Sequence, residues 1–320
     1  MVGYIAAAAV NNVLHQKFGR RGAAFLGPAS HLLAYIVISL HPPYPVLVIA
    51  FIFAGFGNGI VDAAWNAWVG NMANANELLG FLHGFYGLGA TLSPLVATTL
   101  VTKAARQWHH FYLYIMIPLS ALELAVCLSS FWTDTGASFR AANPIDRNAG
   151  LMREALRKRI TWVCAVFLFL YVGIEVALGG WIVTFMIRVR DGGSFASGMV
   201  STGFWLGITL GRVVLGFVTP RIGEKMAVCL YVAVGVGLEI LFWLVPNFVV
   251  SAVAVAVLGF VLGPLFPAAV VATTRLLPAH LHIGAIGFAA AVGGSGACVL
   301  PFAVGGMLLF FSSYSELATD

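Results

Sequence analysis

Five ionisable side chains lie inside long apolar stretches of the sequence, and they are the first candidates for chemistry. They are Asp62, Glu123, Glu175, Arg212 and Glu239. A charged group at membrane depth costs about 2.5–3.5 kcal/mol on insertion scales, so it usually faces a cavity or a partner. Asp62 and Glu175 lie in the middle of their stretches, where a carboxyl group could exchange a proton or bind a polar solute. The alternative for both is a structural hydrogen bond to a neighbouring helix.

The other three groups have simpler expected roles. Glu123 and Glu239 are expected to be protonated or paired with a neighbour. Arg212 lies about seven residues, roughly 10 Å, from the end of its apolar run. It could therefore pair near an inner gate or extend its polar end toward the membrane surface.

Polar and aromatic side chains accompany the two central carboxyl groups. Asn66 follows Asp62 by one helical turn and shares its face. Tyr171 precedes Glu175 by one turn, and Trp181 follows it. Aromatic rings with a few polar groups suit a sugar-like ligand. The pattern predicts a cavity wall made of these residues, next to the two carboxyl groups.

Two glycine patterns indicate how the helices are arranged. The pair Gly179–Gly180 permits a broken helix, and broken helices mark binding sites in transporters. A second set recurs at i, i+4 and i+7, a spacing that lets two helices approach closely: Gly80, Gly84 and Gly87. His83 and Tyr86 lie within this glycine stripe, and we expect them either to pack or to line the cavity.

The composition excludes a water-soluble fold. The chain is 60% hydrophobic and 9% charged, whereas a soluble domain carries about 25% charged residues. The four cysteines lie in apolar stretches without metal-ligand spacing. No nucleotide-binding loop and no catalytic triad is visible. We therefore expect a membrane protein that is not an enzyme, with no cofactor, no metal and no nucleic-acid partner.

Apolar runs long enough for about 20 helical residues predict an all-α polytopic protein with about ten transmembrane helices. The predicted spans are 1–14, 22–40, 46–72, 79–102, 109–132, 160–187, 195–218, 226–245, 248–273 and 283–310. In the ninth of these, Pro264 and Pro267 are expected to bend the helix.

A basic stretch separates the chain into two halves. The predicted organisation is a first half bundle at 1–132, a linker at 133–159 that includes Arg147 and ends in a basic surface helix, and a second half bundle at 160–320. Alternate loops, the linker included, hold twelve Lys and Arg residues against four on the opposite side. This excess places the linker in the cytoplasm.

A repeat with an offset of 204 residues connects the halves. Asn12–Arg21 and Gly216–Lys225 share the pattern basic-x-Gly-x-basic, and three glycines elsewhere recur at the same offset. The pattern residues of the first copy are Gln16, Lys17, Gly19, Arg20 and Arg21, and those of the second are Arg221, Gly223 and Lys225. Duplicated halves in an apolar chain are typical of secondary transporters.

The repeat also predicts a parent architecture of six plus six helices. Mapped by the offset, the chain would lack the first helix of the first half, carry a clipped second helix, and lack the last helix of the second half. We therefore expect a chain that is truncated at both ends relative to this architecture.

The duplicated loop resembles that of the major facilitator superfamily. Within the superfamily, three glycine-rich stretches resemble the fucose-permease-like group, closest to its fungal members of the bypass-of-stop-codon type: Gly55–Asn66, Leu82–Gly89 and Tyr171–Trp181. The resemblance implies a role of Asp62 in proton coupling and a gating role for the loop pattern. The superfamily has an aspartate where this chain has Gln16, so the conformational lock attributed to that aspartate should be weaker here.

These observations predict a proton-coupled symporter of a sugar-like or small polar solute, working by alternating access. We expect a monomer that binds a solute, protons and the lipid bilayer, in the plasma membrane rather than an internal one. Two alternatives stay open: a truncated, transport-inactive sensor or scaffold, and a facilitator for drug-like solutes. The second is disfavoured because no Gly-Pro follows the glycine stripe.

Overall fold

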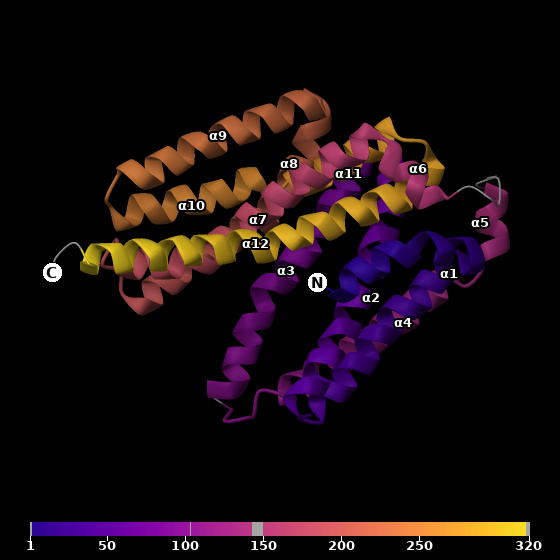
Figure 1. Ribbon diagram of the computed structural model, residues 1–320, viewed down its shortest axis with the longest axis horizontal. Coiled ribbons are helices and arrows are strands. Elements are labelled where there is room, and N and C mark those ends of the chain that lie inside the picture. Colours follow the sequence, from indigo (N-terminus) through magenta and orange to yellow (C-terminus); the bar gives the residue numbers. More distant parts are fainter. Residues whose placement is uncertain (1, 103, 143–149, 318–320) are drawn as a thin grey trace. The chain divides into compact units, whose positions relative to one another are not determined.

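The structure, a computed structural model, describes residues 2–102, 104–142 and 150–317, and these form helices without a β-strand (Figure 1). In chain order the helices are α1 (Val2–Ser39), α2 (Tyr44–Gly70), α3 (Ala75–Thr102), η1 (Tyr112–Met116), α4 (Ile117–Phe131), α5 (Gly136–Ala142), α6 (Leu151–Arg157), α7 (Arg159–Arg188), α8 (Ser194–Ile222), α9 (Glu224–Leu244), α10 (Phe248–Leu262), α11 (Leu265–Leu276), η2 (Ala279–Leu281) and α12 (His282–Leu317). The predicted all-α polytopic class is confirmed.

Eight stretches of the described residues are long and apolar enough to cross a membrane. The predicted total was about ten. Part of the difference lies in α1, which joins the predicted spans 1–14 and 22–40 into one element and replaces the expected loop by a kink at Gly19. The predicted span 79–102 forms α3, which is not among the eight.

The chain divides by its contacts into two compact units, each made of three segments. Unit 1 comprises Met1–Ala75, Leu92–Ala165 and Val270–Ala291. Unit 2 comprises Asn76–Thr91, Val166–Ala269 and Val292–Asp320. The organisation into halves at 1–132 and 160–320 stays a prediction. Within the predicted linker, Arg147 falls in the segment 143–149, outside the described residues, and the predicted basic helix at its end forms α6.

In unit 1, α1 packs against α2 through small side chains. Ala7 and Ile60 are fully buried in this contact. The Asn11 amide, also buried, donates to the carbonyl oxygens of Gly59 and Ile60 at 3.3 Å each. Small residues bring the two backbones close enough for this bond. The contact fixes α1 beside α2, the helix that carries Asp62.

The kink in α1 depends on the conformation of Gly19. Its φ is 68° and its ψ is −163°, a combination that residues with a Cβ atom rarely adopt. A Cβ atom at this position would lie 2.3 Å from the Asp134 carbonyl oxygen. Gly223, the equivalent glycine of the second loop pattern, also has a positive φ, 90°, but a Cβ atom there would lie in open space among the described residues. The repeat therefore recurs in the backbone as well as in the sequence.

We expect Gly19→Ala to lower the stability of the protein by about 1–3 kcal/mol, because the backbone strain combines with a steric conflict against Asp134. Gly223→Ala is the matched control: it requires a positive φ in an uncrowded position and should cost less. The stability losses of both variants are measured by thermal unfolding of the detergent-solubilised protein, with the fraction that stays folded read from size-exclusion chromatography. Equal losses for the two variants would contradict the importance of the Asp134 contact.

In unit 2, the glycine stripe of α3 packs against α8, as predicted. A Cβ atom on Gly80 would lie 2.5 Å from the Arg212 carbonyl oxygen, and one on Gly87 would lie 2.4 Å from the Thr209 hydroxyl. Along the same segment of α3, His83 is buried and Tyr86 is exposed. The close approach of the two helices brings this part of α3 next to Arg212.

Two further expectations about helix breaks have opposite outcomes. The predicted bend in the span 248–273 is confirmed, because α10 ends at Leu262 and α11 begins at Leu265, on either side of Gly263 and Pro264. The expected break at Gly179–Gly180 is wrong, because α7 continues through both residues. Gly179 instead leaves room for the indole of Trp205, whose Cζ2 would lie 2.7 Å from a Cβ atom there.

Candidate functional site

The first group of candidate residues lies in unit 1 and centres on the carboxyl group of Asp62. Asn66, one turn later on α2, donates to Asp62 Oδ1 at 2.8 Å and is buried. Tyr4 on α1 donates its hydroxyl to Oδ2. Both carboxylate oxygens therefore accept a hydrogen bond, while Asp62 itself is only partly buried.

The partners of Asp62 are neutral. Among the residues that the structure describes, none forms an ion pair with its carboxylate. Hydrogen bonds from Tyr4 and Asn66 hold the side chain in place without fixing its charge by a permanent cation. A carboxyl group in this arrangement can take up or release a proton without breaking an ion pair.

The second group lies in unit 2 and centres on a buried ion pair. Arg212 on α8 donates from Nη2 to Glu175 Oε1 on α7 at 2.9 Å. The two side chains are 4% and 6% exposed. Arg212 Nη1 also donates to the His83 carbonyl oxygen at 3.4 Å. The option that Arg212 extends to the membrane surface is therefore wrong, and the option of pairing is confirmed.

Aromatic side chains surround this pair. The Tyr86 ring centroid lies 5.7 Å from the Arg212 guanidinium carbon, within the range of a cation–π interaction. Tyr171 is buried, and its hydroxyl lies beside both Glu175 and Arg212 without a hydrogen bond of good geometry. Arg212 Nε is also buried without a partner among the described residues. One nitrogen of the pair itself, Arg212 Nε, and the Tyr171 hydroxyl beside the pair therefore lack a hydrogen bond of good geometry.

His83 and Trp181 have packing contacts of their own in unit 2. The His83 ring lies 4.7 Å from the ring of Phe266, centroid to centroid. The Trp181 indole nitrogen donates to the Pro301 carbonyl oxygen of α12 at 3.0 Å. A Cβ atom on Gly305 of α12 would lie 2.9 Å from Trp181 Cζ2, so the indole packs closely against this helix.

The first loop pattern holds the segment that follows α4. Arg20 pairs with Asp134 at 3.0 Å, and the Arg21 backbone N–H donates to the Asp134 carbonyl oxygen at 3.0 Å. Arg140 on α5 donates to the Gln16 carbonyl oxygen. Lys17 is exposed. In the second loop pattern, Arg221 and Lys225 are exposed on either side of Gly223. A gating role for these loops stays a prediction.

The two remaining carboxyl groups have different environments. Glu123 on α4 pairs with His31 on α1 at 3.1 Å, Oε2 to Nδ1, which confirms the expected partner. Glu239 on α9 has no hydrogen bond or ion pair to any described residue. Its carboxyl group is therefore left in an apolar environment without compensation.

Sequence reasoning missed the partners that come from other helices. Tyr4 and His31 were not identified as candidates, although each contacts a singled-out carboxyl group. Tyr4 lies 58 residues from Asp62, and His31 lies 92 residues from Glu123. These pairs could have been found only by knowing which helices lie next to one another in the fold.

Comparison with known proteins agrees with this architecture. The sequence pattern of the Major Facilitator Superfamily matches residues 1–301. Bypass of stop codon protein 6 of Saccharomyces cerevisiae is 30% identical to this chain, over 95% of the chain and 67% of that protein. The glucose/mannose transporter GlcP of Bacillus subtilis is 23% identical, over 87% of the chain and 70% of that protein.

Among solved structures, the fucose:proton symporter FucP of E. coli superimposes with a TM-score of 0.75 at 13% identity, covering 98% of this chain and 82% of FucP. At this identity the likeness shows the fold. The sequence match over most of the chain shows the family, and it confirms the resemblance to bypass-of-stop-codon proteins. The chain belongs to the Major Facilitator Superfamily of membrane transporters.

Proposed function

We propose that the protein is a proton-coupled symporter of a sugar-like or other small polar solute, acting as a monomer in the plasma membrane. The observation that carries this proposal is the Asp62 carboxyl group, which lies in a helix long and apolar enough to cross a membrane and has two neutral hydrogen-bond partners. The names of two similar proteins support the solute class, since one is a glucose/mannose transporter and the other a fucose:proton symporter.

We assign the binding of the co-transported proton to the carboxyl group of Asp62. Tyr4 donates to its carboxylate in the ionised form, and the same hydroxyl can accept from the carboxylic acid after protonation. The site therefore keeps a hydrogen bond in both protonation states. Movement of α1 against α2 would change the Tyr4 contact, which couples the protonation state of Asp62 to conformation.

Glu175 and Arg212 are assigned to solute binding and to conformational control. Their ion pair holds α7 against α8, and it is buried. A hydroxylated solute can replace one partner of the pair, because hydroxyl groups both donate to carboxylates and accept from guanidinium groups. The unused Tyr171 hydroxyl and Arg212 Nε supply two further hydrogen-bond positions.

Aromatic side chains near this pair favour a solute with apolar ring faces. Tyr86 is 65% exposed and lies over the Arg212 guanidinium. Sugars present C–H faces that pack on aromatic rings and hydroxyl edges that bond to polar groups. In unit 2 we assign His83 and Trp181 to contact with the solute, and in unit 1 we assign Asn66 to the polar wall beside Asp62.

Uptake by purified protein in lipid vesicles tests the proposal. Radiolabelled glucose, mannose, fucose and xylose are offered with and without an inward proton gradient. We expect gradient-dependent accumulation of at least one sugar, abolished by a protonophore. Uptake equal to that of protein-free vesicles for every sugar would favour the sensor or scaffold, and gradient-independent uptake of lipophilic cations would favour the drug-like facilitator.

A further inference from the structure

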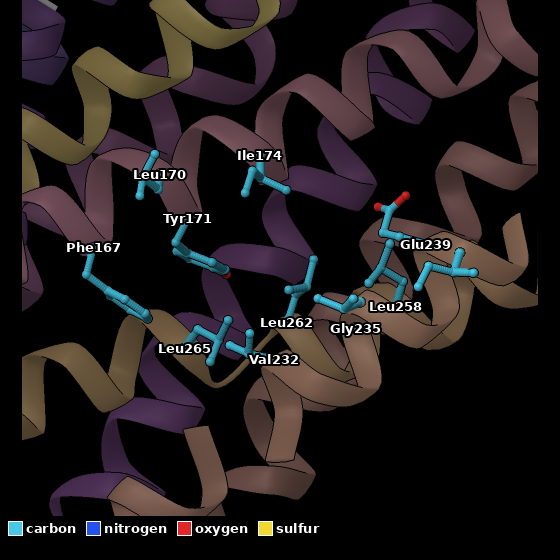
Figure 2. Close-up of a pocket in the computed structure, with 12 residues that line it drawn as sticks. Phe167, Leu170, Tyr171, Ile174, Val232, Gly235, Glu239, Leu258, Leu262 and Leu265 are labelled. Atoms are coloured by element: carbon cyan, nitrogen blue, oxygen red, sulfur yellow. The ribbon is translucent and has the colours of Figure 1, made fainter. Parts of the chain in front are cut away.

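Two surfaces of the membrane-spanning helices differ in their chemistry. In unit 2, an apolar groove of about 360 Å³ is lined by α7, α9, α10 and α11 (Figure 2). Its polar lining residues are Tyr171 and Glu239, so the lining offers no positive charge. In unit 1, the segment that joins α6 to α7 is instead rich in exposed cations. This second surface, unlike the groove, suits an anionic ligand.

The cations at the junction of α6 and α7 form a surface that we call the basic corner. Its members are all exposed: Arg153, Arg157, Lys158 and Arg159. The first two lie one turn apart on α6, on the face opposite the buried Ala155. Residues 150–165 contain these four basic residues and one acidic residue, Glu154, which leaves a local net charge of +3.

The basic corner lacks the partners that other cations of unit 1 have. Arg20 pairs with Asp134 at 3.0 Å, and Arg140 donates to a backbone carbonyl oxygen of α1. Within the described part of the chain, no carboxylate forms an ion pair with a cation of the basic corner. The neighbouring Glu154 instead lies 3.5 Å from His280 of η2, Oε1 to Nε2. The positive charge of the corner is therefore left for a ligand to neutralise.

Hydrogen bonds fix the backbone of the corner. The Thr161 hydroxyl donates to the Ala155 carbonyl oxygen at 2.7 Å, and the Trp162 indole N–H donates to the Leu156 carbonyl oxygen at 2.8 Å. Both acceptors lie in the last turn of α6, where a helix leaves carbonyl groups open to outside donors. Ala155 also packs in a buried cluster with Leu281 of η2. The basic side chains therefore extend from a backbone that is held in place.

Trp162 indicates that the corner lies at the membrane surface. The apolar span of α7 begins at Arg159. Trp162 lies about 4.5 Å further along the helix, and it is 50% exposed. Tryptophan is enriched at the level of the lipid headgroups. The next residue, Val163, is 53% exposed and offers apolar surface to an acyl chain. Exposed cations and exposed apolar groups thus meet at the depth where a phospholipid has its phosphate.

We propose that the basic corner binds the headgroup of an anionic phospholipid. Arg157, Lys158 and Arg159 bind its phosphate oxygens, because charge-assisted hydrogen bonds to phosphate are strong. Its acyl chain lies along Trp162 and Val163. A phospholipid satisfies both parts of this surface, whereas a free anion would use the charged part alone. Anionic lipids are enriched in the cytoplasmic leaflet, the side on which the sequence places the linker.

Native mass spectrometry of the purified full chain tests the site. The protein is equilibrated in mixed micelles that hold equal amounts of phosphatidylcholine and phosphatidylserine, and the bound lipids are counted by headgroup. The test variant combines Arg157→Gln with Lys158→Gln. The matched control combines Arg221→Gln with Lys225→Gln, which also removes one arginine and one lysine from exposed positions.

We expect the unchanged protein to bind phosphatidylserine about tenfold or more above phosphatidylcholine. Each basic residue at an anionic membrane surface contributes about fivefold, so the test variant should bind phosphatidylserine about 25-fold more weakly. The matched control should lose less than about threefold. Arg157→Lys keeps the charge and should also lose less than about threefold. Val236→Trp, in the apolar groove, should bind phosphatidylserine as the unchanged protein does.

Four outcomes would overturn the proposal. Equal losses in the test variant and its matched control would assign the preference to overall positive charge. Equal binding of both lipids by the unchanged protein would show that the corner does not recognise the headgroup. Full displacement of phosphatidylserine by an equal concentration of the soluble headgroup, glycerophosphoserine, would assign the corner to a free anion. A loss in Val236→Trp without one in the test variant would place the lipid in the groove.

Discussion

Replacing Arg212 with alanine should lower the stability of the folded protein by about 3–5 kcal/mol, because it leaves the Glu175 carboxylate buried without its partner. The pair is short, 2.9 Å, and both side chains are almost fully buried. Solvent therefore cannot replace the lost guanidinium. Thermal unfolding of the solubilised protein measures the effect. Arg221→Ala, at an exposed position, is the matched control and should change stability by less than about 1 kcal/mol.

A double replacement separates the structural contribution of the pair from its proposed function. Substituting apolar residues for both partners of a buried ion pair is often neutral or stabilising. The combination of Glu175→Leu and Arg212→Met should therefore recover most of the stability that Arg212→Ala loses. It should not recover transport, because the charges assigned to solute binding are absent. A double variant that transports at the wild-type rate would contradict this assignment, and an Arg212→Ala variant of normal stability would contradict the structural contribution.

The sequence predicted the features of the fold that are periodic along the chain. Apolar runs give the helices, and the constant offset gives the recurrence of Gly19 and Gly223, whose positive φ values are the same structural feature twice. The stripe of Gly80, Gly84 and Gly87 marks a close helix contact because small residues at helical spacing leave room for a neighbour. The apolar runs and the glycine stripe are each contained within one helix, and the offset compares two similar loops, so none of these signals depends on knowing which helices pack together.

The sequence could not predict which helices face one another. The distance in sequence between Glu175 and Arg212 is 37 residues, and nothing in either segment specifies the partner. For the same reason Arg212 had two possible environments, and only the packing of α7 and α8 decides between them. The helix break expected at Gly179–Gly180 failed because glycine permits a break without requiring one, and here Gly179 accommodates a tryptophan ring from α8.

A second large effect is expected at Asp62. A proton gradient of about one pH unit supplies roughly 1.4 kcal/mol per proton, enough for about tenfold accumulation of a solute that enters with one proton. Asp62→Asn keeps the size of the side chain and its hydrogen bonding to Tyr4 and Asn66, but it cannot carry a proton. We therefore expect the ratio of solute concentration inside to outside the vesicles to fall to about one. Exchange of solute between the two sides of the membrane should continue.

The contrast between accumulation and exchange makes this prediction specific. A structural role of Asp62 would reduce both activities together, whereas loss of the proton carrier removes only the accumulation. Asn66→Asp is the matched variant, since it places a second carboxyl group next to the first and tests whether charge repulsion perturbs the site. Counterflow with preloaded vesicles measures exchange, and net uptake against the proton gradient measures accumulation. Full gradient-driven accumulation by Asp62→Asn would show that the proton moves through another group, and the buried Glu175 would then be the next carboxyl group to test.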